Sequence, residues 1–379
     1  MNETVRRTTT PAGDPAWYVS NYDTVRSLLA DRRLGRTHAD PANASHYSKS
    51  VIFGRPEPAS PTEVADHARM RRLLSPWFSA RRLAALRPRV QQLVDGLLDE
   101  LAAGIRPVDF HEVVSFPLPA LVICELLGVP YTDREDFRRW SDEAADMEDQ
   151  ERSLRGLGAL WQYVSGLVAV KLDDPGDDVL SALVAAHRAD PDAFGLDDVA
   201  QLGAGLLFAG HETTVAAIDT GVVLLATHPQ QRDALRRNPD LGEAAVEEIL
   251  RAALPDPVPV RASGTTGLAR WTNADVEIGG TTIPAGELVL LGLQEANDSP
   301  RLVGDSGGFD VTRHPNPHLT FGHGPHFCIG APLARLELRV LFAALLDRFP
   351  TLRLAVPPAD LQPRNESLTG GLAALPVTW

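Results

Sequence analysis

The chain has 379 residues, 44% of them hydrophobic and 23% charged, which is ordinary for a globular protein with a large core. Its formal net charge of −14 argues against nucleic acid as the main partner, because phosphate binding requires a basic surface. Only two cysteines occur, Cys124 and Cys328, and they indicate neither a disulfide framework nor a multi-cysteine zinc site.

No segment approaches the roughly 20 apolar residues that span a bilayer, and residues 1–19 lack the apolar core of a signal peptide. We therefore expect a cytoplasmic protein with no membrane partner.

Apolar residues recur at three- and four-residue spacing through most of the chain, which predicts helices. The segments concerned are residues 67–103, 115–128, 151–172, 197–227, 230–254 and 332–348. Strand-like patterns are short and lie at residues 16–19 and 276–283, the second broken by the Gly279-Gly280 turn. We expect a mainly α protein with a smaller β region, folded as a single domain over residues 1–379.

The apolar helix predicted at residues 197–227 is interrupted by Ala209-Gly210 and then by Glu212-Thr213-Thr214. Glycine and hydroxyl residues weaken a helix locally, and an inserted water can bend it there. Glu212 and Thr213 are adjacent, so their side chains point about 100° apart and cannot both face one ligand. This predicts that Thr213 faces a bound ligand while Glu212 reaches toward water. We interpret His211 as structural.

Glu248 and Arg251 lie three residues apart in a predicted helix, close enough to pair. Such pairs are common on solvated helix faces, where they contribute little to stability. The pair alone therefore indicates no function.

The strongest signal is the segment FGHGPHFCIGAPLARLE at residues 321–337. Gly322, Gly324 and Gly330 allow the backbone to approach something flat and close, and Pro332 suits the first turn of a helix. Cys328 would then lie near a helix N-terminus, where free N–H groups stabilise a thiolate. Cys124 has no such surroundings, and we interpret it as a small buried hydrophobic residue.

The pattern Phe321-x-x-Gly324-x-x-x-Cys328-x-Gly330 resembles the haem-binding loop of the cytochrome P450 family, and the resemblance extends over nearly the whole chain. It implies the cytochrome P450 fold and a bound haem b whose iron is held by Cys328. A thiolate ligand pushes electron density to the iron and favours O–O cleavage.

Two further motifs gain roles from this resemblance. Ala209-Gly210-x-Glu212-Thr213 resembles the family's acid–alcohol pair, which implies that Thr213 holds activated oxygen from O2 and that Glu212 relays protons. Glu248, Arg251 and a later Arg313 resemble the family's structural triad behind the haem, which supports the fold.

The two haem propionates require fixed cations and hydrogen-bond donors from separate segments. The resemblance assigns this role to His67 and Arg71, four residues apart on one helix face, to His326 and to Arg270. Arg261 is a rival of Arg270. Candidate substrate contacts are Leu206, Leu207, Ala209, residues 257–260 and residues 368–369.

The implied reaction is insertion of one oxygen atom from O2 into a lipophilic small molecule, by hydroxylation or epoxidation, as a step that tailors a specialised metabolite. The electrons come ultimately from NAD(P)H through a ferredoxin and a ferredoxin reductase. An acidic ferredoxin would require a locally basic face, for which the candidates are Arg69, Arg72, Arg81, Arg82, Arg335 and Arg339.

Two alternatives remain open on the sequence. The same parts serve oxidative coupling, nitration or desaturation, and a haem-bearing scaffold without oxygenase activity is also conceivable, although intact Glu212 and Thr213 argue against it. The chain also departs from the family pattern at Asp298-Ser299, where an arginine–aspartate pair is common, which removes a cation and alters local pairing.

Overall fold

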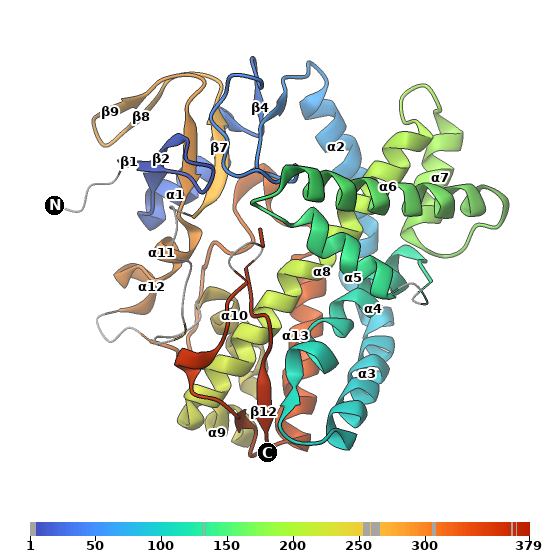
Figure 1. Cartoon of the computed structure of the whole chain (residues 1–379), viewed down its shortest axis with the longest axis vertical. Helices are drawn as coiled ribbons and strands as arrows, with labels where there is room; N and C mark the ends of the chain where they lie inside the picture. Colours follow the sequence, from blue (N-terminus) through green and yellow to red (C-terminus); the bar gives the residue numbers. More distant parts are fainter. Residues whose placement is uncertain are drawn as a thin grey trace.

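One long helix, α8 (Leu196–Thr227), runs through the centre of the computed structural model and organises the helical part of the molecule (Figure 1). The structure describes residues 5–130, 132, 134–252, 258, 266–304, 308–364, 367–368 and 370–379. Around α8 pack α4 (Pro117–Leu127), α6 (Gln150–Asp173), α7 (Val179–Ala189), α9 (Pro229–Arg237), α10 (Gly242–Arg251) and α13 (Ala331–Arg348).

The close packing of α8 on α13 depends on a glycine. A Cβ atom at Gly221 would lie 2.2 Å from the ring of Phe342, so a larger residue would separate the two helices. The remaining helices are α1 (Tyr22–Ala30), α2 (Glu63–Leu74), α3 (Ala80–Ala103), α5 (Arg134–Ala144), α11 (Leu293–Asn297) and α12 (Pro300–Val303).

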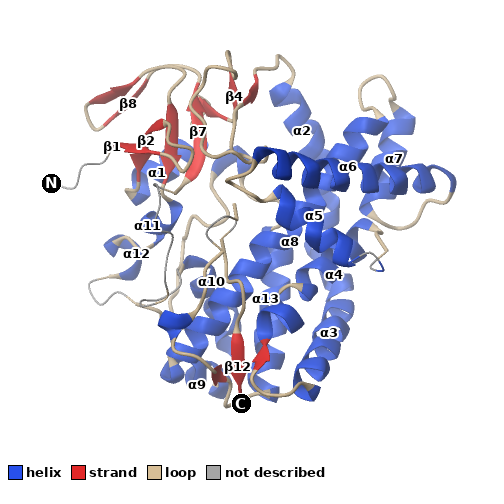
Figure 2. Cartoon of the chain, viewed as in Figure 1, coloured by secondary structure: helices blue, strands red, loops and turns tan. Residues whose placement is uncertain are grey.

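Most strands lie at one side of the molecule, whereas a few lie among the helices at the opposite end, near the C-terminus (Figure 2). The main sheet has the order β1-β2-β10-β7-β3, in which β2 and β10 are parallel and the other pairs antiparallel. Its strands are β1 (Arg6–Thr9), β2 (Pro15–Val19), β3 (Leu34–Gly35), β7 (Leu268–Thr272) and β10 (Leu288–Leu291).

Three small sheets complete the β region. The predicted turn at Gly279-Gly280 is confirmed, with both residues at positive φ between β8 (Val276–Ile278) and β9 (Thr281–Ile283), as a tight hairpin requires. The other sheets pair β4 (Thr37–His38) with β5 (Glu57–Pro58), and β12 (Pro376–Thr378) with β6 (Val108–Asp109) and β11 (Arg353–Leu354).

The mainly α prediction is confirmed, but two predicted helices are divided. Residues 67–103 form α2 and α3, separated by a 3-10 turn at Ser75–Phe78 that contains Pro76. Residues 230–251 form α9 and α10, which are separated at Asn238 and Pro239. In both places a proline removes a backbone donor and interrupts the helix, although the apolar periodicity continues.

The apolar core is divided between the helical part of the molecule and the main sheet. One large apolar cluster fills the space between the helices and includes Cys124, as predicted, and a second lies beneath the main sheet. Within the described ranges, no helix is both long and apolar enough to cross a bilayer.

Candidate active site

The cysteine loop ends at the start of α13, as predicted. The amide of Cys328 donates to the carbonyl of Phe321 at 2.9 Å, Gly330 caps the helix, and Pro332 lies in its first turn. Desolvation raises the pKa of the Cys328 thiol, whereas the backbone amides of Gly330 and Ala331 lower it in part. The helix N-terminus therefore favours the thiolate, as expected. Burial outweighs this effect, so the side chain stays a thiol until a bound metal ion ionises it.

The loop glycines have a structural role within the protein itself. Gly324 has φ +75°, and a Cβ atom there would lie 2.9 Å from Cα of Ala30 in α1. Gly324 therefore allows a close approach of the loop to the neighbouring helix, and the predicted approach to a flat ligand stays a prediction. Gly322 is also left-handed at φ +74°, but Gly330 has helical backbone angles. The glycines seat the loop against α1.

Three of the expected cationic residues come together from separate segments. The rings of His67 in α2 and His326 in the cysteine loop lie 4.3 Å apart. Burial lowers the pKa of His326, and the charge of nearby Arg270 on β7 lowers it further. Arg71 donates from Nη1 to the carbonyl of Phe327 at 2.9 Å, so it supports the loop directly.

Arg270 is a cation without a matching anion. Burial and the charge of Arg36 lower its pKa to about 10. Its Nη1 donates to the carbonyl of Ala269 at 2.7 Å, and no carboxylate in the described part of the chain lies within ion-pair distance. A partly buried guanidinium is expected to have an anionic partner, so the site suits a bound carboxylate. The rival Arg261 lies outside the described residues.

Arg36 was missed by the sequence analysis. It belongs to no motif and forms an ion pair with Glu57, and its charge acts on both Arg270 and His326. Only the fold brings it to this cluster.

A cavity of about 790 Å³ lies between α8 and the main sheet. Thr213 lines it and donates from Oγ1 to the carbonyl of Ala209 one turn earlier, at 3.0 Å. Most of its wall is apolar or aromatic, including Tyr47, Phe53, Phe208, Leu268, Leu291, Leu293 and Leu368.

Glu212 lies beside Thr213 but not toward bulk water, which corrects the sequence expectation. Its side chain is 2% exposed, and Oε2 lies 3.6 Å from Nη1 of Arg364. His211 is fully buried, its Nε2 lies 3.1 Å from the carbonyl of Phe116, and burial lowers its pKa to about 3. The imidazole is therefore neutral and packs as a structural residue.

The candidate substrate contacts divide into two groups. Ala209 and Leu368 line the cavity, whereas Leu207 is fully buried in the core and Leu206 packs against that core. Neither residue lines the described cavity, so their predicted contact with substrate stays a prediction. Val258 is buried, and positions 257, 259, 260 and 369 lie outside the described residues.

Comparison with known proteins decides the family. The model of the family described as cytochrome P450 matches residues 169–376. The chain is 40% identical to pentalenolactone synthase from Streptomyces exfoliatus over 97% of its own length and 91% of that protein. This chain belongs to the cytochrome P450 family.

The chain is also similar to other proteins and solved structures, two of which are described as cytochromes P450. The monooxygenase PikC from Streptomyces venezuelae is 39% identical, over 98% of this chain and 87% of that protein. Among solved structures, the substrate-free pimaricin epoxidase PimD has a TM-score of 0.85 and 41% identity, covering 99% of this chain and 93% of that one. SgvP, a putative thioether synthase of griseoviridin tailoring, has a TM-score of 0.89 and 39% identity, covering 100% and 94%.

The structural triad of this cytochrome P450 is assembled. Oε2 of Glu248 lies 2.8 Å from Nε of Arg251 and 3.0 Å from Nε of Arg313. Nδ2 of Asn316 donates to Oε2 at 2.9 Å, and the amide of Asp310 donates to Oε1 at the same distance. The buried carboxylate is thus well satisfied.

The expected basic face for a redox partner is largely neutralised in this cytochrome P450. Arg82 pairs with Asp177, Arg335 with Glu247 and Arg339 with Glu243, each at 2.6 Å, and Arg69 lies 3.4 Å from Asp66. Arg72 and Arg81 are exposed and have no ion-pair partner in the described ranges.

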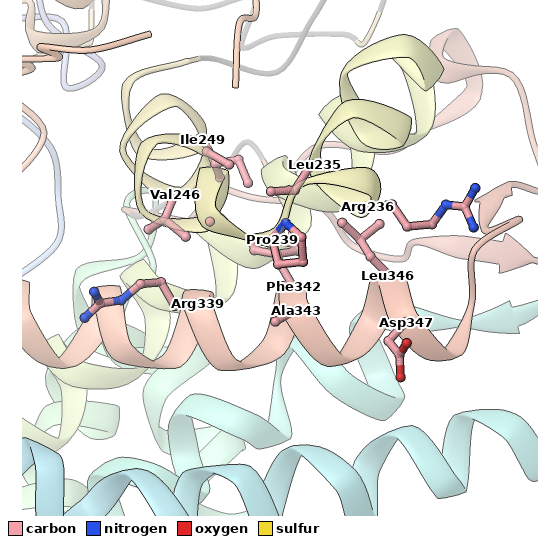
Figure 3. A pocket seen from close by; sticks show the side chains of 12 residues that line it. Leu235, Arg236, Pro239, Val246, Ile249, Arg339, Phe342, Ala343, Leu346 and Asp347 are labelled. Carbon is pink, nitrogen blue, oxygen red and sulfur yellow. The ribbon is translucent and has the colours of Figure 1, made fainter. Parts of the chain in front are cut away.

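A second cavity, of about 140 Å³, lies outside the active site between α10 and α13 (Figure 3). Val246, Ile249, Phe342 and Leu346 form its apolar lining, while Arg339 and Asp347 are at its rim. It contains none of the candidate haem or acid–alcohol residues.

Proposed function

We propose that this cytochrome P450 monooxygenase tailors a lipophilic specialised metabolite by hydroxylation or epoxidation. The observation that carries the proposal is the placement of Cys328 at the N-terminus of α13, close to a group of hydrogen-bond donors, His67, His326 and Arg270, of which Arg270 has no anionic partner in the described chain. Similar proteins include a mycinamicin IV hydroxylase/epoxidase from Micromonospora griseorubida and a pimaricin epoxidase, which supports the substrate class.

Haem b is the cofactor that these residues fit. Cys328 would hold the iron, while Arg270, His67 and His326 would hold the propionates, with Arg71 supporting the loop that carries His326 and Cys328. Bound haem supplies the activation of O2 and the oxygen transfer, and the protein supplies ligation, protons and orientation.

The roles of the remaining residues follow from their positions. The Thr213 hydroxyl lies at the cavity wall, where it would hold a proton for a group bound in the cavity. Glu212, shielded from bulk water and one residue away, would supply protons to this site. The apolar wall, with Phe208 and Leu368, orients a lipophilic substrate and excludes water.

Electrons reach a cytochrome P450 from redox partners, and we assign this role to a ferredoxin and its NAD(P)H-dependent reductase in the cytoplasm. The exposed cations Arg72 and Arg81 are the docking contacts that remain available without breaking an intramolecular ion pair. Arg72→Glu should therefore slow ferredoxin-supported reduction more than Arg339→Glu, because Arg339 is already paired with Glu243.

The deciding experiment is the optical spectrum of the dithionite-reduced protein under carbon monoxide. The wild-type protein and a Cys124→Ser control should both give the strongly red-shifted Soret band of a thiolate-ligated haem, because Cys124 is buried away in the core. Cys328→Ser should lose that band. A protein without haem, or a histidine-type spectrum that Cys328→Ser leaves unchanged, would overturn the proposal.

A further inference from the structure

One guanidinium group and two carboxylates meet beside α8. Nη2 of Arg364 lies 2.7 Å from Oδ1 of Asp142 in α5, and Nη1 lies 3.6 Å from Oε2 of Glu212 in α8. The three residues come from different parts of the chain. Arg364 thus forms a bridge between α5 and the helix that carries the acid–alcohol pair.

The segment that carries Arg364 is fixed on both sides. The amide of Leu368 donates to the carbonyl of Ala145, at the end of α5, at 2.9 Å. The amide of Arg364 itself donates to the carbonyl of Gly371 at 3.0 Å, and a Cβ atom at Gly371 would lie 3.6 Å from Ala216 of α8. Since Leu368 lines the cavity, this one loop contributes to the cavity wall and also contacts Glu212 through Arg364.

The charges of the three groups act on one another. Burial raises the pKa of Asp142, the charge of Arg364 lowers it, and the charge of Glu212 raises it. Asp142 is the most accessible of the three, with 32% of its side chain exposed, against 14% for Arg364 and 2% for Glu212. Asp142 is therefore the outer carboxylate and Glu212 the inner one.

His211 and Arg138 also lie near these carboxylates, but neither supplies the positive charge that Arg364 places beside Glu212. Nδ1 of His211 lies 3.6 Å from Oε1 of Glu212, but burial keeps that imidazole neutral at ordinary pH. Arg138 also acts on Asp142, yet it makes its own ion pair with Glu112 at 2.6 Å.

We infer that Arg364 is a positioning residue for Glu212, which it holds at α8 while Asp142 competes for the same guanidinium group. The inference rests on the proposed function, in which Glu212 supplies protons. In the sequence, Arg364 lies 152 positions after Glu212, so only the fold brings the two side chains together.

The first test does not depend on turnover. The Asp142 carboxyl is titrated by infrared spectroscopy of its C=O stretch in the full chain, and the band is assigned by its loss in Asp142→Asn. We expect the titration midpoint to move to higher pH in Arg364→Gln and to lower pH in Glu212→Gln, with Arg364→Lys close to wild type. Arg353→Gln, at an exposed arginine of β11, is the matched control and should change nothing. If Glu212→Gln left the Asp142 midpoint unmoved, the shared bridge would be refuted.

The second test uses the haem-loaded enzyme with a surrogate ferredoxin and reductase and 7-ethoxycoumarin as the probe. We expect Arg364→Gln to release several-fold more hydrogen peroxide per NADPH oxidised and to increase the solvent isotope effect, whereas Arg364→Lys restores most of the wild-type ratio. A purely structural role would lower haem content and thermal stability without changing this ratio. Wild-type peroxide release and isotope effect in Arg364→Gln would overturn the inference.

Different results would refute the haem-thiolate function and the positioning role of Arg364. A wild-type protein without the thiolate-type carbon monoxide spectrum would refute the haem-thiolate function, while the infrared titration still reports whether Arg364 couples Asp142 to Glu212. A normal spectrum with no infrared coupling would refute the positioning role alone.

Discussion

Oδ1 of Asp298 lies 2.8 Å from Nη1 of Arg251, which makes it a fourth charged member of the cluster around Glu248. The departure from the family pattern at Asp298-Ser299 thus removes a cation but contributes a carboxylate to the triad. Arg251 is 2% exposed and Glu248 is fully buried, whereas the Asp298 side chain is 49% exposed. The four charges therefore differ widely in their contact with solvent.

This difference predicts unequal effects on stability. Glu248→Gln removes the charge that compensates buried Arg251 and should lower the free energy of unfolding by about 3–5 kcal/mol. Asp298→Asn should cost only about 0–1 kcal/mol, because water screens the exposed carboxylate. Urea unfolding followed by tryptophan fluorescence measures both. Equal losses in the two variants would contradict this account of the cluster.

His111 and Asp219 predict a pH dependence of stability. Nδ1 of His111 lies 2.8 Å from Oδ2 of Asp219, and both side chains are almost fully buried. Burial lowers the pKa of His111, but the hydrogen bond and charge of Asp219 more than offset this, so the pKa is raised overall. The stabilisation by the pair is then complete below about pH 6.5, the ordinary histidine value, and is lost as the pH rises through the folded-state pKa.

The comparison with Asp219→Asn isolates this effect. We expect the free energy of unfolding of the wild type, minus that of Asp219→Asn, to decrease as the pH is raised from about 5 to about 9. The subtraction removes the opposite contribution of His211, whose pKa burial lowers to about 3. A difference that stays constant with pH would show that the pair is neutral throughout.

Arg270 predicts opposite effects in the haem-free and haem-loaded protein. Because its partly buried charge has no anionic partner in the described chain, Arg270→Met should raise the Tm of the haem-free protein. The same change removes a charge-assisted hydrogen bond to a propionate, about 1.5–3 kcal/mol, and should weaken haem binding about 10- to 150-fold. Differential scanning calorimetry and haem transfer to an acceptor protein measure the two effects.

The control for Arg270 is Arg7→Met, on the exposed edge strand β1, where the guanidinium pairs with Glu287 at 2.7 Å. This variant should change the free energy of unfolding of the haem-free protein and the free energy of haem binding by no more than about 0.5 kcal/mol each. If Arg270→Met shifted the two states in the same direction, its role would be packing and not anion binding.

Gly324 predicts a specific effect on the cysteine loop. Gly324→Ala forces a side chain into the left-handed backbone region, at about 1–2 kcal/mol, and also against Ala30 of α1, which adds about 1–3 kcal/mol. Gly280→Ala, at φ +84° with open space around it, incurs only the first cost. Only Gly324→Ala should shift or weaken the carbon monoxide Soret band, and an equal spectrum in both variants would refute the proposed seating of the loop.

Local sequence was sufficient for the cysteine loop, because its parts are neighbours in the chain. Cys328, Gly330 and Pro332 lie within five positions, and the start of α13 follows from their order. The division of residues 67–103 was also readable, since Pro76 lies within the apolar repeat, but periodicity alone does not report a lost backbone donor.

The missed residues depend on contacts that no local pattern contains. Arg36 lies in a short strand region without a motif, and Arg364 lies in a C-terminal segment without periodicity, so only the fold places them near Arg270 and Glu212. The burial of Leu207 was equally unreadable from the sequence, because an apolar residue of α8 can face the cavity or the core, and only packing decides which.

The ion pairs of Arg335 and Arg339 affect how the binding of a redox partner depends on ionic strength. An acidic electron donor that bound Arg335 and Arg339 would have to replace Glu247 and Glu243, so at these residues an intramolecular contact is traded for an intermolecular one and few counterions are released. Contact with these two arginines should therefore depend only weakly on ionic strength, whereas contact with Arg72 and Arg81, which are unpaired in the described chain, should depend on it more. Further affinity for the partner at this face would come from apolar contact, for which Phe327 is available. This residue is 38% exposed and adjacent to Cys328.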